Sequence, residues 1–96
     1  PREPPRDYAG FFNTFSALNT ESVMSSIWPM ISSKSGRQEL GRYLIKGVCD
    51  LYQGDYNPHF LTGLGSLLWV LEKYPAEETV CRNALYQYLD YYFRSR

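Results

Sequence analysis

Residues 57–73 read NPHFLTGLGSLLWVLEK, an apolar stretch with a clear start and a clear end. Asn57 is a good capping residue and Pro58 suits the first position of a helix, so the pattern predicts a helix from Pro58 to about Lys73. Its apolar residues cover most of the helix: Leu61, Leu64, Leu68 and Leu71 line one face, and Phe60, Leu67, Trp69 and Val70 extend beyond it. A helix that is apolar nearly all round is typical of a buried position, and we expect this helix to be the central one.

A helix is predicted on each side of this stretch. The upstream helix spans about Arg37 to Gln53, with Gly54 as its C-terminal cap, and the downstream helix starts at Pro75. Their expected core stripes are Leu40, Tyr43, Leu44, Gly47, Val48 and Leu51 in the first, and Cys81, Ala84, Leu85, Tyr88, Leu89 and Tyr92 in the second. Because the connections are short, these last three helices are expected to be antiparallel neighbours.

The N-terminal part predicts two more helices. The first is capped by Asp7 and runs to about Leu18, and the second follows Asn19 and is expected to kink or break at Trp28, before Pro29. Residues 32–36 read as a loop, and residues 1–6, with three prolines, as an extended lead-in or linker end. No stretch alternates as a strand does. The sequence therefore predicts an all-α domain over residues 7–96, a compact bundle or solenoid-like stack of about five helices.

Composition narrows the possible functions. Ten basic residues balance ten acidic ones, which disfavours binding that rests on phosphate contacts. The longest apolar run, Leu67 to Leu71, is far shorter than the roughly 18 residues of a membrane span, so no membrane association is expected. Cys49 and Cys81 are expected to be two buried thiols in a reducing compartment, while a disulfide between them remains open.

No grouping of residues indicates catalysis. His59 is the only histidine, so metal sites and nucleophilic triads would have to use it, and no cysteine or carboxylate stands at the spacing they need. The run Gly63-Leu64-Gly65-Ser66 lacks the lysine and the preceding strand of a phosphate-binding loop. We expect no enzymatic activity, no cofactor, no metal and no small-molecule substrate.

Glycines inside a helix need a compensating reason, since each costs about 1 kcal/mol relative to alanine. We expect Gly63 and Gly65 to allow close approach of another helix, with Gly41 and Gly47 of the preceding helix as the facing positions. On this expectation, a leucine at position 65 overpacks the interface and destabilises the fold.

Aromatic residues are abundant, at 17% of the chain, and crowd the last predicted helix. If Leu85 and Tyr92 face the core together with Tyr88 and Leu89, then Tyr86, Tyr91 and Phe93 point elsewhere. Such a cluster indicates a contact surface, covered by a partner or by the rest of a parent protein. Trp28, at the helix break, is expected to anchor the first two helices onto the last three, or else to meet a partner.

Two functions follow as hypotheses. The first is a protein–protein interaction domain (adaptor, scaffold or oligomerisation), excised from a larger intracellular protein of the cytoplasm or nucleus. Its expected partner-binding residues are Tyr86, Tyr91, Phe93 and Trp28. The alternative is a helical nucleic-acid-binding domain that uses Arg37, Arg42 and Lys46.

Overall fold

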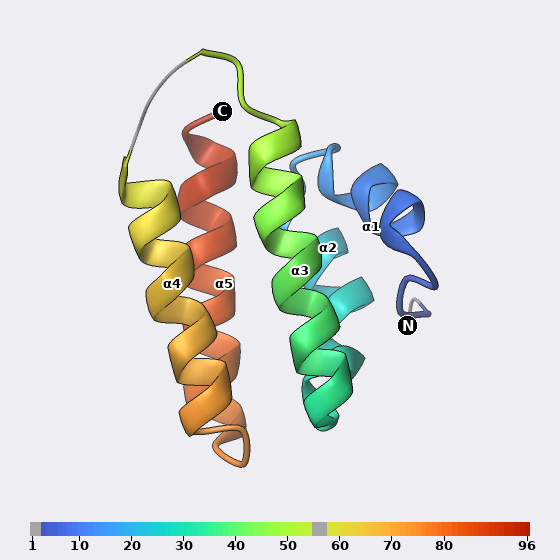
Figure 1. The fold of residues 1–96 in the computed structure, drawn as a ribbon, viewed down its shortest axis with the longest axis vertical. Coiled ribbons are helices and arrows are strands. Elements are labelled where there is room, and N and C mark those ends of the chain that lie inside the picture. The colour runs from blue at the N-terminus through green and yellow to red at the C-terminus, as the bar shows by residue number, and fades with distance from the viewer. Residues whose placement is uncertain (1–2, 55–57) are drawn as a thin grey trace.

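The computed structural model describes residues 3–54 and 58–96, and every regular element in these ranges is a helix. The chain runs through α1 (Tyr8–Phe15), α2 (Thr20–Ile27), the short 3-10 helix η1 (Trp28–Ser32), α3 (Lys34–Asp50), α4 (Pro58–Lys73) and α5 (Glu78–Arg94) (Figure 1). The predicted all-α fold class is confirmed.

Side-chain caps set the starts of the first two helices. The Asp7 carboxylate accepts a hydrogen bond from the backbone N–H of Gly10 at 2.8 Å, and Asn19 accepts one from Ser22 at 2.9 Å. α1 ends at Phe15, earlier than predicted, and Leu18 turns the chain with a φ of 59°. This left-handed residue lets α2 fold back and contact α1.

The predicted break at Trp28 is confirmed. α2 ends at Ile27, and the chain continues as the 3-10 helix η1 with Pro29 in its first turn. Proline has no N–H to donate to the preceding turn and its ring clashes there, so the α-helix cannot continue unchanged. The change of direction places η1 against α3.

The loop predicted over residues 32–36 is wrong in its second half, because α3 already begins at Lys34. Ser33 caps this helix by accepting a hydrogen bond from the N–H of Gly36 at 3.0 Å. A Cβ at Gly36 would lie 2.2 Å from the carbonyl oxygen of Met30. Only glycine therefore fits at position 36, where the first turn of α3 packs against η1.

The ends of the last helices differ slightly from prediction. α3 ends at Asp50 rather than Gln53, and Gly54 follows with a φ of 88°, a conformation that glycine adopts readily. α5 begins at Glu78, three residues after the predicted start at Pro75. Asn57, the predicted cap of α4, lies outside the described residues.

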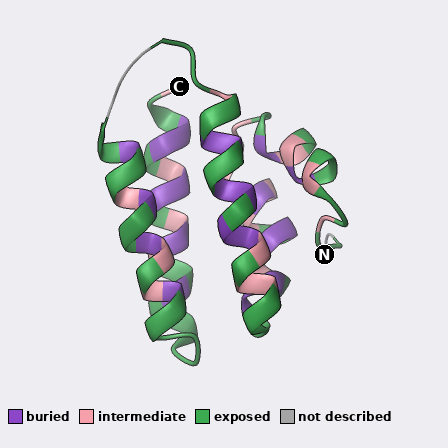
Figure 2. Ribbon diagram, in the orientation of Figure 1, coloured by how far each residue is buried: buried purple, intermediate pink, exposed green. Residues whose placement is uncertain are grey.

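The consecutive helices α3 and α4, and likewise α4 and α5, are antiparallel neighbours, as predicted (Figure 1). The central position predicted for α4, however, is wrong. The N-terminal elements pack on its two neighbours instead: α1 and η1 pack against α3, and α2 packs against α5. The main packing of α4 is with α3 and α5. α4 therefore lies at one edge of the bundle, and exposed residues run along it (Figure 2).

The buried face of α4 is rotated from the predicted one. It consists of Phe60, Leu64, Leu67 and Leu71, all at most 7% exposed. Leu68 is half-buried, and Leu61, which was predicted to line the core face, is exposed. Because α4 has neighbours on one side only, its second set of apolar side chains remains at the surface.

Aromatic rings fill the core where α1 meets the C-terminal half of α5. Phe15 is fully buried and lies 5.0 Å from Phe11, 5.2 Å from Phe93 and 5.9 Å from Tyr92, measured between ring centroids. Tyr92 also meets Phe60 of α4 edge-on at 4.8 Å. The cluster joins α1, α4 and α5, and each described helix contributes buried residues to the same core.

Of the glycines expected to allow close approach, Gly47 is the one that is tightly packed, since a Cβ there would lie 3.0 Å from the Phe15 ring. A Cβ at Gly41 would lie 3.5 Å from Leu68, and one at Gly63 would lie 3.5 Å from Tyr88, which are ordinary contact distances. The glycines of α3 thus face α1 and a leucine of α4, not the glycines of α4. The close packing predicted at Gly65 is wrong, since a Cβ there meets nothing within 4 Å.

Candidate interaction surfaces

An exposed apolar surface lies on the side of α4 that faces away from the core. We call it the α4 outer face, and it is lined by Leu61, Thr62, Gly65, Ser66, Trp69 and Val70, around a shallow hollow of about 630 Å³. Leu61 is 53% exposed and Trp69 is 54% exposed. Two large apolar side chains are thus exposed on one helix, one turn on each side of a glycine.

The helical repeat of α4 explains why this surface exists. Phe60 and Leu64 already supply the core-facing stripe, together with Leu67 and Leu71. Leu61, Gly65 and Trp69 follow one another at intervals of four residues, which places them in one row on another side of the helix. Trp69 is further held by Tyr74, whose ring meets it edge-on at 5.8 Å. These apolar side chains exceed what the core requires.

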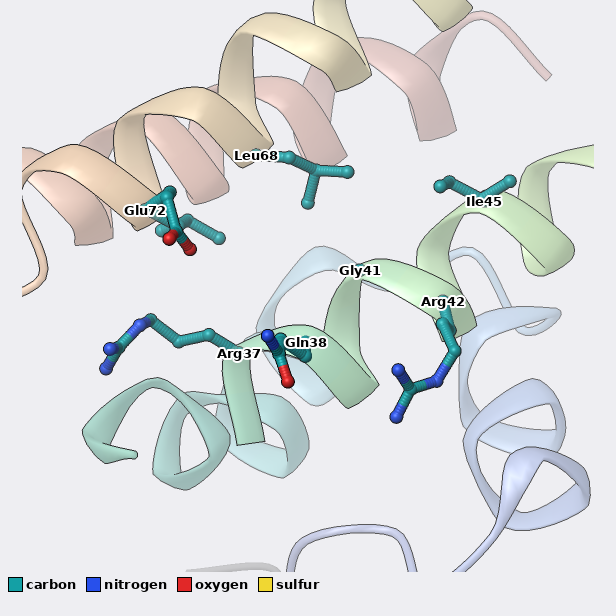
Figure 3. Close-up of a pocket in the computed structure, with 8 residues that line it drawn as sticks. Arg37, Gln38, Gly41, Arg42, Ile45, Leu68 and Glu72 are labelled. Atoms are coloured by element: carbon teal, nitrogen blue, oxygen red, sulfur yellow. The ribbon is translucent and has the colours of Figure 1, made fainter. Parts of the chain in front are cut away.

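A second hollow, of about 420 Å³, lies between α3 and α4 (Figure 3). Gly41 forms its floor on α3, Leu68 reaches towards it from α4, and Ile45, 47% exposed, lies further along α3. The remaining lining residues are Arg37, Gln38, Arg42, Leu71 and Glu72. Leu68 belongs to the same helix as the α4 outer face, so both hollows have residues of α4 in their lining.

The three basic residues of the nucleic-acid hypothesis all lie on α3, and each has a polar partner within the chain. Arg37 donates through Nη1 to the carbonyl of Ile31 at 2.8 Å and is half-buried. Arg42 pairs with Glu39 at 2.8 Å, and Lys46 pairs with Asp50 at 3.3 Å, while both basic side chains stay exposed. Arg37 and Arg42 line the same hollow but point in different directions in Figure 3. The nucleic-acid hypothesis stays a prediction.

Two of the predicted partner-binding residues, Trp28 and Tyr86, lie in the same groove between α2 and α5. Its lining also includes Glu21, Met24, Ser25, Pro29 and Arg82, and its volume is about 420 Å³. The guanidinium of Arg82 lies over the Trp28 ring, 5.0 Å from the centroid. Trp28 is half-buried and packs against the core, so it joins the N-terminal helices to α5.

Polar contacts across the same groove tie α2 to α5. The Tyr86 hydroxyl donates to the Glu21 carboxylate at 3.0 Å, and this hydrogen bond raises the pKa of Tyr86. Thr20 donates to Asp90 at 3.1 Å, and the hydrogen bond from Arg94 to Asp90 lowers the pKa of that carboxyl. Tyr86 therefore supports the fold from its half-buried position.

The other two predicted partner-binding residues, Tyr91 and Phe93, differ in their exposure to solvent. Tyr91 is exposed, as expected, and its ring meets Phe60 edge-on at 5.8 Å. The prediction that Phe93 points away from the core is wrong, because Phe93 is only 6% exposed and packs against Phe15. Besides α4 and α2, which pack along α5, α1 covers Phe93 through Phe15, so the buried arc of α5 is wider than a single stripe.

Residues with possible chemical reactivity are few. Within residues 3–54 and 58–96, no three His, Cys, Asp or Glu side chains lie close enough to hold a metal ion. Both cysteines are free thiols. Cys81 is buried, as expected, and donates to the carbonyl of Tyr74 at 3.1 Å, whereas Cys49 is exposed, contrary to the prediction. Among the described helices, none has both the length and the apolar character to cross a bilayer.

The α4 outer face is not among the partner-binding surfaces predicted from the sequence. A signal for it was present in the sequence, because Phe60, Leu64, Leu67 and Leu71 follow the 4–3–4 spacing of a core stripe. That register leaves Leu61 and Trp69 outside. No family model matches the chain, and no curated protein or solved structure matches it either.

Proposed function

We propose that this chain is a non-catalytic protein-interaction domain that docks a protein partner through the α4 outer face. One observation carries the proposal: Leu61 and Trp69 are each more than half exposed beside a glycine on a helix side that no described element covers. Burying such side chains against a partner is favourable by about 25 cal/mol for each Å² of apolar area.

The chemistry of this surface suits a protein partner. The cores of protein–protein interfaces are poor in charged residues and rich in aromatic ones, and tryptophan is prominent among residues that dominate binding energy. From Pro58 to Leu71 the helix carries no Asp, Glu, Lys or Arg. The neighbouring hollow, with Ile45 and Leu68, extends the apolar area towards α3.

The free thiols of Cys49 and Cys81 support an intracellular setting for this interaction, since reducing compartments keep cysteines unpaired. The polar side chains that line the α4 outer face are the hydroxyls of Thr62 and Ser66, and that of Thr62 donates to the carbonyl of Pro58 at 2.9 Å. A lining without an acid, a base or a thiol supports a binding role for this surface in preference to a catalytic one.

Photocrosslinking in cells tests the proposal. A photoreactive phenylalanine analogue at Ser66, an exposed residue of the α4 outer face, is expected to form adducts with protein upon irradiation. The same group at Gln87, an exposed residue of α5, serves as the matched control. Adducts at position 66 should disappear when Trp69→Glu is added. Equal adduct formation at both positions, or adducts that persist with Trp69→Glu, would contradict the proposal.

Folding of the Trp69→Glu variant is expected to be unimpaired. The side chain is 54% exposed, and its ring contacts Tyr74, outside the buried core. Exposed substitutions of this kind change the free energy of unfolding by about 0.5 kcal/mol or less. Urea unfolding followed by circular dichroism measures the change, and a loss above roughly 2 kcal/mol would show that Trp69 belongs to the fold instead.

A further inference from the structure

If the α4 outer face docks a protein, as proposed above, its residues also indicate which protein. We propose that the occupant is a second copy of this chain, whose own α4 lies antiparallel across the first, with a two-fold axis at Gly65. Three features support this pairing: the spacing of the exposed side chains, the glycine at the centre of their row, and the absence of charged side chains from Pro58 to Leu71.

The spacing of the exposed side chains is self-complementary. Leu61 lies four residues before Gly65, and Trp69 lies four residues after it. An antiparallel pair about Gly65 sets Leu61 of one copy opposite Trp69 of the second copy, and the reverse contact follows by symmetry. A two-fold interface requires this kind of reciprocity, in which the same patch serves on both sides.

The centre of the row is shaped for close approach. A Cβ at Gly65 would meet nothing within 4 Å, so no contact inside the chain requires glycine there. Glycine nevertheless weakens a helix relative to alanine. A helix of a second copy that crosses at Gly65 explains the glycine, because two helix backbones can approach closely only where side chains are small. The neighbouring residue on the same surface, Ser66, is also small.

The charges do not oppose the pairing of two copies. The chain carries ten basic and ten acidic residues, so two copies do not repel one another at long range. From Pro58 to Leu71 α4 carries no Asp, Glu, Lys or Arg, so the paired faces bring no like charges together. An antiparallel crossing also sets the positive N-terminal end of each α4 nearer the negative C-terminal end of the other.

The size of the surface sets the expected strength. α4 has 16 residues, and a helix of this length is about 24 Å long. One helix face of that length, with Ile45 and Tyr74 at its margins, falls at the low end of specific interfaces, below about 1,200 Å² in total. The dimer is therefore expected to be weak and to dissociate on dilution to low micromolar concentration.

Light scattering and sedimentation of the purified chain under reducing conditions test the inference. The mass is expected to rise from 11.2 kDa towards twice that value between about 10 µM and about 1 mM protein. The reducing agent prevents the exposed thiol of Cys49 from linking copies covalently. A mass that stays at the monomer value over this range would overturn the inference.

Charge substitutions on the two sides of the proposed axis make the test specific and leave Gly65 unchanged. Leu61→Glu and Trp69→Lys each set a charge against an apolar side chain at both reciprocal contacts, and each alone is expected to weaken association at least tenfold. An equimolar mixture of the two variants should associate more tightly than either alone, because the new carboxylate meets the new ammonium group at one contact while the other contact keeps Leu61 opposite Trp69. Gln87→Glu, on exposed α5, should associate like the unmodified chain. Wild-type-like dimers of either single variant, or no recovery in the mixture, would overturn the two-fold contact at Gly65.

Failure of this inference is distinguishable from failure of the proposed function. If the purified chain stays monomeric while position 66 still forms adducts in cells with a different protein, the second copy is excluded and the docking role stands. If position 66 forms no protein adducts in cells either, both proposals fail.

Discussion

Replacing Phe15 with alanine is expected to lower the free energy of unfolding by about 3–5 kcal/mol. The ring is fully buried and contacts Phe11, Tyr92 and Phe93, so its removal loses apolar burial and leaves a cavity between α1 and α5. A chain of 96 residues has a total stability of roughly 5–14 kcal/mol, so the expected loss is at least about a fifth of it and, for a stability at the low end, most of it.

Chemical denaturation in urea, followed by circular dichroism, measures this loss. Phe12→Ala is the matched control, because Phe12 is the same residue type in the same helix but only partly buried. Its loss should be clearly smaller. Equal losses for the two variants would show that the contacts of Phe15 with α5 do not dominate the packing of α1.

The second large effect is expected for Gly36→Ala, which should destabilise the fold by about 3 kcal/mol. The added Cβ would lie 2.2 Å from the carbonyl oxygen of Met30 and 2.9 Å from Oγ of Ser33. The first of these is a backbone atom, so η1 and the start of α3 must move apart. Ser33 then also loses its position as the helix cap.

Gly65→Ala is the control for Gly36→Ala, since both replace a helical glycine. Position 65 has open space around the added methyl group, and alanine favours the helix, so this variant should gain up to about 1 kcal/mol. Thermal unfolding at low micromolar concentration, where the proposed dimer is dissociated, compares them. Melting temperatures that shift in the same direction would contradict the difference between the two sites.

Local chemistry made much of this fold predictable. The caps at Asp7 and Asn19 and the break before Pro29 rest on a few neighbouring residues, so they can be recognised from sequence alone. The starts of α3 and α5 were less predictable. Gly36 stands inside α3 because of a contact with Met30, and a glycine beside serines otherwise resembles a loop.

The position of α4 in the bundle could not be predicted from its composition. An apolar helix shows how much surface could be buried, but not how many neighbours will bury it. α1, α2 and η1 pack on α3 and α5, so α4 remains at the edge with Trp69 exposed. Phe93 is the opposite case, since α1 adds a neighbour that a single-helix pattern does not reveal.

The contacts between α2 and α5 also constrain how the chain folds during synthesis. Tyr86 bonds to Glu21, and Asp90 to Thr20, across 65 and 70 residues of sequence. A nascent chain can therefore form α2 long before the helix that covers it has left the ribosome. Until α5 arrives, Ile27 and Phe15 lack part of their native cover. Ribosome-bound chains that stop before α5 should accordingly be more sensitive to protease than chains that include it.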